Sequence, residues 1–106
     1  MVNKITLIGN LGRDPESKVF DNGNVVVKFS LATNESYKDK DGEWQQRAEW
    51  HTVVLWNNLA KAAIEKLKKG STAYVEGKMT YRTHEREDGH KIKYAEVAGS
   101  YFRKLD

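Results

Sequence analysis

Apolar and polar residues alternate with a period of two along most of this 106-residue chain, and short turn sequences interrupt the alternation. Such a pattern is typical of β-strands that bury one of their two faces. One long alternating segment runs from Val25 to Asn34, and its apolar face consists of Val25, Val27, Phe29 and Leu31. Other segments of the same kind cover residues 5–8, 18–20, 49–56, 71–81 and 91–101. The pattern therefore predicts a mainly β protein.

Turn-forming pairs of residues predict hairpins between these strands. Asn22-Gly23 follows the 18–20 segment and Asp88-Gly89 separates the last two strands, and such pairs favour tight hairpin turns. We interpret the polar residues 36–46 as a long exposed hairpin loop. Strands of a closed barrel bend at glycines, and three glycines are suitably placed: Gly9, Gly12 and Gly77.

One segment breaks the β pattern and predicts a helix. Asn57-Asn58 offers an N-cap, and Gly70 offers a C-terminal stop after a lysine-rich last turn. Between them, apolar residues recur at helical spacing: Leu59, Ala60, Ala63, Ile64 and Leu67. Three strands, one helix and two strands in this order are the connectivity of the OB fold. We expect one domain over residues 1–106, an all-β (mainly), five-stranded Greek-key barrel with one helix between strands 3 and 4 and protruding hairpin loops.

The segment 49–56 carries the first candidate for a binding surface. Alternation puts one set of side chains on one face of this strand: Trp50, Thr52, Val54 and Trp56. The opposite face holds His51, Val53 and Leu55, which suit a barrel interior. An exposed indole can stack on any nucleobase, and each such contact contributes about 1–3 kcal/mol. The alternative is that both indoles belong to the core.

Two other aromatic residues lie within the 36–46 segment. Tyr37 is next to Lys38 and near Lys40, a combination that suits base stacking together with phosphate neutralisation. Packing of Tyr37 over the barrel rim is the alternative. Trp44 lies within the polar segment, and a contact with nucleic acid and a contact with a neighbouring subunit both remain open for it.

Composition narrows the classes of function. The net charge is +3, and residues 57–106 carry eleven Lys or Arg against seven Asp or Glu. This charge suits a polyanionic partner without requiring one. The chain has no Cys, which excludes disulfides and thiolate chemistry. Its apolar runs are far shorter than a membrane span, so we expect a cytoplasmic protein with no membrane partner.

The sequence offers no arrangement typical of an enzyme. The three histidines, His51, His84 and His90, lack metal-binding spacing, although His84 and His90 could face each other across the last hairpin. Gly9-Asn10-Leu11-Gly12 follows a strand but opens no helix, so it is not a phosphate-binding loop. We therefore expect no catalytic residues, no metal and no cofactor.

The chain resembles bacterial single-stranded DNA-binding proteins over nearly its whole length. The resemblance is strongest in Glu49-Trp50-His51-Thr52-Val53-Val54-Leu55-Trp56. The other similar segments are residues 3–16, 29–37, 67–71, 74–78 and 95–97. The resemblance implies an OB-fold homotetramer that binds and protects single-stranded DNA at the nucleoid, without sequence preference, during replication, recombination and repair.

The resemblance also implies roles for single residues. Three aromatic side chains match positions that stack on bases: Tyr37, Trp50 and Trp56. His84 stands where the family often has a further aromatic, and an imidazole stacks less strongly. His51 matches a position at the subunit contact. We expect four cations along the DNA backbone: Lys4, Lys40, Lys69 and Arg82. Of these, Lys40 and Lys69 match family positions that are commonly basic. Three family positions that can be basic are neutral here: Thr52, Asn58 and Thr83.

Members of this family continue into a tail whose acidic tip recruits replication and repair proteins. The residues here end at Leu105-Asp106, so we do not expect that recruitment from the residues present. Two other classes of function remain open. One is a replisomal OB module that docks mainly on a helicase or polymerase. The other is an oligosaccharide-binding or enzyme-accessory OB domain in which Trp50 and Trp56 stack on sugar rings.

Overall fold

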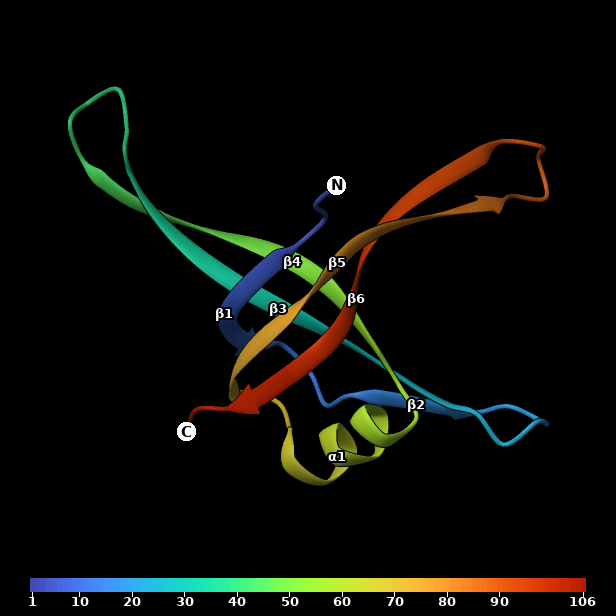
Figure 1. Cartoon of the computed structure of the whole chain (residues 1–106). Helices are drawn as coiled ribbons and strands as arrows, with labels where there is room; N and C mark the ends of the chain where they lie inside the picture. Colours follow the sequence, from blue (N-terminus) through green and yellow to red (C-terminus); the bar gives the residue numbers. More distant parts are fainter.

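Six strands and one helix follow one another along the chain (Figure 1). The computed structural model describes residues 1–106. Its elements are β1 (Ile5–Leu11), β2 (Glu16–Val19), β3 (Val25–Lys38), β4 (Trp44–Trp56), α1 (Asn58–Lys66), β5 (Thr72–Glu85) and β6 (Lys91–Lys104). The helix stands between β4 and β5, as the sequence predicts, and β2 is a short strand that pairs only with the start of β3.

The sheet closes on itself. Its strand order is β1-β5-β6-β4-β3-β2, and β1 also pairs with β3 through Asn10↔Ala32 and Leu11↔Leu31. β4 and β6 pair in parallel and all other pairs are antiparallel. The five strands β1, β3, β4, β5 and β6 thus form a barrel with one helix, which confirms the expected OB fold. α1, nine residues long, is too short and too polar to cross a membrane.

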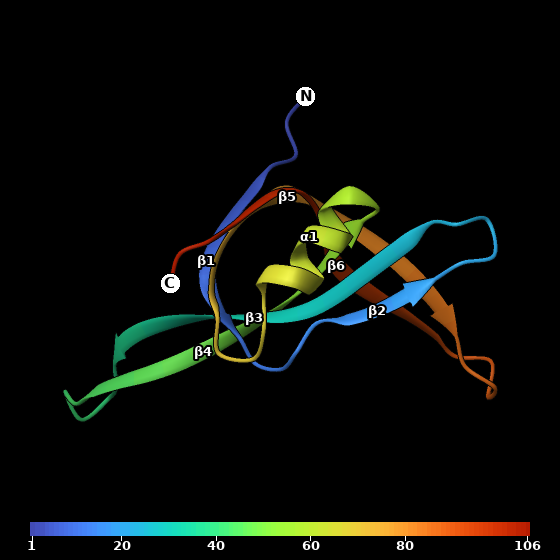
Figure 2. The ribbon, with the colours of Figure 1, turned by 90° about the horizontal axis from the view of Figure 1, so that it is seen from below.

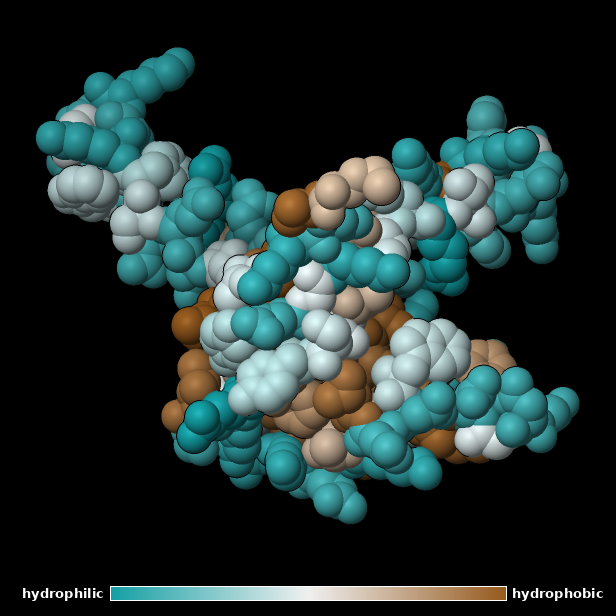
Figure 3. Space-filling view, viewed as in Figure 1, coloured by the Kyte–Doolittle hydropathy of each residue, from teal (hydrophilic) through white to brown (hydrophobic).

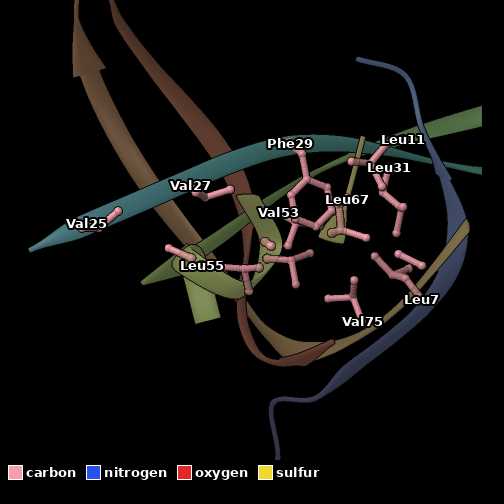
Figure 4. Close-up of a cluster of buried hydrophobic side chains, with 14 residues drawn as sticks. Leu7, Leu11, Val25, Val27, Phe29, Leu31, Val53, Leu55, Leu67 and Val75 are labelled. Carbon is pink, nitrogen blue, oxygen red and sulfur yellow. The ribbon is translucent and has the colours of Figure 1, made fainter. Parts of the chain in front are cut away.

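The barrel interior is filled by the apolar face that the alternation predicts. Val25, Val27, Phe29 and Leu31 of β3 are all buried, and so are Val53 and Leu55 of β4 (Figure 4). Helix α1 lies across one end of the barrel, where it buries Ala60 and Ala63 (Figures 1 and 2). Because branched aliphatic side chains dominate this core, its stability comes mainly from burial of apolar area.

Two of the three expected glycines lie where strands approach closely. A Cβ atom on Gly9 would lie 2.1 Å from the carbonyl oxygen of Ala32. A Cβ atom on Gly77 would lie 2.3 Å from the carbonyl oxygen of Ala98, at a β-bulge between Glu76 and Gly77. Only glycine leaves room for these crossings, so the barrel depends on it at both positions.

The interpretation of residues 36–46 as a long loop is wrong. β3 and β4 stay paired from Val26↔Trp56 to Lys38↔Trp44 and project from the barrel as a two-stranded ribbon (Figure 1). Only the tip, residues 39–43, is a turn, and the Asp39 carboxylate accepts hydrogen bonds from two of its backbone N–H groups. Both faces of this ribbon are in solvent, so hydrophobic alternation cannot reveal it.

The predicted N-cap position of the helix is confirmed, but the side-chain cap and the predicted C-terminal stop are not. Asn57 occupies the N-cap position, but its Oδ1 accepts a hydrogen bond from the N–H of Val25 at 3.0 Å and caps no helical N–H group. The helix ends at Lys66, because Leu67 turns into an extended conformation and packs into the core. Gly70, with φ +88°, therefore belongs to the following turn and does not end the helix.

Candidate nucleic-acid interface

Trp50 and Trp56 lie on the outer face of β4. Their side chains are 59% and 48% exposed, whereas Val53 and Leu55 on the other face are fully buried. The alternative that both indoles are core residues is therefore wrong. Since the two indoles are six residues apart on a strand, they lie about 20 Å from each other along β4. They mark the two ends of one face of the sheet.

The Trp50 end is built on the segment that follows β1. The indole lies against Gly12, where a Cβ atom would come within 2.6 Å of the ring. Gly12, Arg13, Ser30 and Trp50 line a cavity of about 430 Å³ there. Asp14 accepts a hydrogen bond from the backbone N–H of Lys69 at 2.8 Å, which brings the predicted cation Lys69 to the same end.

Polar side chains connect the two indoles along the outer face. A small cavity of about 100 Å³ lies between β2, β3 and β4, and Lys28, Ser30 and Thr52 are among its lining residues. Thr52 and Ser30 are partners across the β3–β4 pair. The face between the indoles therefore carries polar side chains together with Val54, and Lys28 and Arg13 are cations of this region.

The Trp56 end carries a second aromatic ring. Phe20, which precedes the β2–β3 turn, stacks on Trp56 with a centroid distance of 5.9 Å and an interplanar angle of 18°. The Lys18 ammonium lies 5.0 Å from the Phe20 centroid. A cavity of about 420 Å³ adjoins both rings, and Lys28, Arg82 and Glu96 also line it. It lies between the β2–β3 hairpin and the β5–β6 ribbon, where the molecular surface is hollowed (Figure 3).

The same face continues onto the β5–β6 ribbon. Thr80, Arg82 and His84 alternate along β5 on the side that faces this cavity, and Tyr94 is the cross-strand partner of Arg82. The Arg82 guanidinium lies 5.6 Å from the Tyr94 ring centroid. The structure thus brings the predicted residues Trp56, Arg82 and His84 onto one surface.

Tyr37 does not share this surface. On β3 it follows the odd-numbered positions, which continue the inner face of the barrel, whereas Trp50 and its partner Ala32 belong to the outer face. The guanidinium of Arg47 lies 5.1 Å from the Tyr37 ring centroid, and a hydrogen bond to Glu35 raises the pKa of that guanidinium. Trp44, which is 70% exposed, lies on the Trp50 side of the ribbon.

The other predicted residues lie away from the indoles. Lys40 is exposed in the tip of the β3–β4 ribbon. Lys4 lines a separate cavity of about 560 Å³ together with Lys78 and Glu76. His51 is half-buried on the inner face of β4, where its Nε2 shares a hydrogen bond of 2.9 Å with Thr33 Oγ1.

The two histidines of the last hairpin do not face each other. His84 is the cross-strand partner of Ile92, and His90 lies in the turn, 3.0 Å from a carboxylate oxygen of Asp88. No three His, Cys, Asp or Glu side chains lie together in an arrangement suited to a metal ion.

Comparison with known proteins identifies the family of this chain. The model of the single-strand binding protein family matches residues 2–105. The chain belongs to this family. Single-stranded DNA-binding proteins from two strains of Neisseria meningitidis, of serogroups A and B, are each 43% identical to it over 104 residues. That alignment covers 98% of this chain and 60% of each relative, so the chain spans about 60% of the length of these relatives.

A solved structure of the same family has nearly the same fold. It is described as a Plasmodium falciparum SSB complex with ssDNA, and it superposes with a TM-score of 0.91 at 32% sequence identity. The superposition covers 100% of this chain and 97% of the other. The resemblance stated from the sequence is thereby confirmed as family membership.

Several residues close to the two indoles are not among those predicted from the sequence. They are Arg13, Phe20, Lys28 and Tyr94. The outward position of Lys28 could have been predicted from the sequence, because Lys28 lies between Val27 and Phe29, which are both buried. Phe20 had no comparable signal, since its position opposite Trp56 depends on how the β2–β3 hairpin folds over β4.

Proposed function

We propose that this chain binds single-stranded DNA without sequence preference and protects it during replication, recombination and repair. The observation that carries the proposal is the pair of exposed indoles, Trp50 and Trp56, at the two ends of one face of β4. Exposed rings at this spacing can stack on separate bases of one strand, whatever the bases are. The same face has no catalytic arrangement, so the proposed role is binding and not catalysis.

Base stacking is accompanied in this proposal by phosphate neutralisation. Lys69 near the Trp50 end and Arg82 near the Trp56 end are positioned for this, and Lys4 and Lys40 extend the positive charge beyond the indoles. Tyr37 and His84 add rings on the two ribbons. Each neutralised phosphate steepens the salt dependence of binding, with a log–log slope of about −0.7 per phosphate on single strands.

We further propose that the chain works as a homotetramer in which His51 lies at a subunit contact. Family membership supports this assembly. In longer relatives, residues beyond the barrel have room to recruit replication and repair proteins, since the alignment leaves about 40% of their length outside this chain. We assign no such recruitment to residues 1–106.

Titration with oligo(dT) tests the proposal directly. Binding should quench the tryptophan emission and weaken steeply as NaCl rises. A protein whose emission and electrophoretic mobility are unchanged by oligo(dT) would not be a single-stranded DNA-binding protein. A salt-insensitive interaction with an oligosaccharide, or tight binding of a helicase with weak DNA binding, would favour the other two classes. Light scattering coupled to size exclusion, with and without oligo(dT), tests the tetramer.

A further inference from the structure

Two cations from separate strands converge on one carboxylate oxygen beside Trp56. Glu96 Oε2 on β6 lies 3.3 Å from Lys28 Nζ of β3 and 3.2 Å from Arg82 Nη2 of β5. In the sheet, β4 separates β3 from β6, so the Lys28 side chain reaches across a strand to make this contact. All three residues line the cavity that adjoins Trp56 and Phe20.

The carboxylate and the two cations differ in their access to solvent. The Glu96 side chain is 13% exposed, whereas those of Lys28 and Arg82 are 41% and 55% exposed. An anion that enters the cavity from solvent therefore meets the cations at the rim before it meets the carboxylate at the floor. Carboxylate and phosphodiester oxygens accept the same charge-assisted hydrogen bonds from ammonium and guanidinium groups.

We propose that Lys28 and Arg82 form a binding site for one backbone phosphodiester, and that the Glu96 carboxylate occupies this site in the DNA-free chain. Binding of DNA exchanges the partner of both cations from the carboxylate to the phosphodiester. Glu96 is then an internal competitor that lowers the affinity for DNA. This inference rests on the proposed function, because it concerns a base stacked on Trp56 and the phosphate next to it.

The variant Glu96→Gln tests the competition. It removes the negative charge and keeps the size of the side chain and an oxygen that accepts hydrogen bonds. Affinity for oligo(dT) should rise by about two- to fivefold at moderate salt, the range of one partly exposed ion pair. Glu65→Gln makes the same change in net charge at an exposed position of α1, a helix that contributes no residue to the cavity lining. It should leave affinity nearly unchanged because salt screens the charge.

A double-mutant cycle with Lys28→Gln separates a shared site from a general charge effect. Loss of Lys28 should reduce affinity more in the Glu96→Gln background than in the parent chain, since the parent lysine is partly neutralised by Glu96. The log–log salt slope should become shallower by about 0.7 in Lys28→Gln. Equal losses in the two backgrounds would mean that Lys28 and Glu96 do not share a site.

Lysine acetylation followed by mass spectrometry checks the site in the parent chain, without any variant. Oligo(dT) should protect Lys28 from acetylation, and Lys61 on α1 should react equally with and without DNA. Unprotected Lys28 in the complex, or weaker binding by a folded Glu96→Gln variant, would overturn the phosphodiester site. Failure of the parent chain to bind oligo(dT) at all would instead overturn the proposed function.

Discussion

The indole of Trp50 lies against the backbone of Gly12, so closely that a Cβ atom on Gly12 would be 2.6 Å from Trp50 Cζ3 and 2.7 Å from Cη2. The Gly12 N–H donates a hydrogen bond to the carbonyl oxygen of Ser30 at 3.2 Å, which ties this segment to β3. The absence of a side chain at Gly12 therefore leaves room for the Cζ3–Cη2 edge of the indole. Trp50 remains 59% exposed, so much of its ring is accessible to a ligand.

Substitution of Gly12 by Ala should displace the Trp50 indole. Because the backbone at Gly12 is held by Ser30, the ring must move, and stacking on a base should weaken. We expect Gly12→Ala to reduce the binding free energy for oligo(dT), by less than the roughly 1–3 kcal/mol expected for Trp50→Ala. Fluorescence titration measures both. If Gly12→Ala has the affinity and the tryptophan emission of the parent chain, the contact between Gly12 and Trp50 has no influence on binding.

Much of the barrel could be predicted because period-two alternation is enforced wherever one face of a strand is buried. On β4 it correctly puts Val53 and Leu55 inside and Trp50 and Trp56 outside. The same rule fails at residues 36–46, where the strands continue but neither face is buried. Hydrophobic periodicity reports burial and not hydrogen bonding, so a solvated ribbon is read as a loop.

The arrangement around Trp56 could not be predicted, because it depends on contacts between distant segments. Glu96, Lys28 and Arg82 come from three strands, and their convergence requires the register of the whole sheet. The face of the ribbon on which Tyr37 lies likewise follows from the pairing of β3 with β4. The local alternation of residues determines which side chains point outward, whereas the register of strand pairing determines which of these side chains contact one another.

Substitution of Gly77 by Ala should destabilise the barrel. The added Cβ atom would lie 2.3 Å from the carbonyl oxygen of Ala98 and 3.0 Å from the Cα atom of Gly99, and both are backbone atoms that cannot rotate away. Overpacking of this kind lowers the free energy of unfolding by about 1–3 kcal/mol. Thermal or urea unfolding should show this loss, while Ser17→Ala on the edge strand β2 should stay within about 0.5 kcal/mol of the parent. If Gly77→Ala were as stable as the parent, the close approach of Gly77 to the backbone of Ala98 would be contradicted.

The tip of the β3–β4 ribbon should loosen in acid. Hydrogen bonds from the backbone N–H of Glu43, from the Gln45 side chain and from the N–H of Asp41 lower the pKa of Asp39. A carboxyl whose pKa is lower in the folded state stabilises the fold above its unfolded pKa, about 3.9, and this contribution is lost as the pH falls through the folded pKa.

Amide chemical shifts of Asp41 and Glu43, followed from pH 6 downward, measure the loosening of the tip. They should change together below about pH 4. In Asp39→Asn the same two amides should lack this acid transition, because the titrating acceptor is gone. Amide shifts in the parent chain that stay constant across the acid range would rule out Asp39 as the group that fastens the tip.

Phe20 and Trp56 should be coupled in DNA binding, whereas Tyr37 and Trp50 should act independently. The first pair is stacked at 5.9 Å, so loss of either ring disturbs the surface offered by the other. The second pair lies on opposite faces of the β3–β4 ribbon. Residues in contact usually show coupling free energies of about 0.5–3 kcal/mol, and separated residues add to within about 0.5 kcal/mol.

Two double-mutant cycles with alanine substitutions, measured as binding free energies for oligo(dT), compare these pairs under one set of conditions. Each single variant should weaken binding. The Phe20→Ala and Trp56→Ala double variant should lose clearly less than the two single losses together, because the second substitution removes part of a surface that the first has already disrupted. The Tyr37→Ala and Trp50→Ala double variant should lose about the sum of its single losses. Strong coupling of Tyr37 with Trp50 would mean that the two residues contact the same stretch of DNA around the edge of the ribbon, and additivity of Phe20 with Trp56 would mean that Phe20 has no part in the stacking surface.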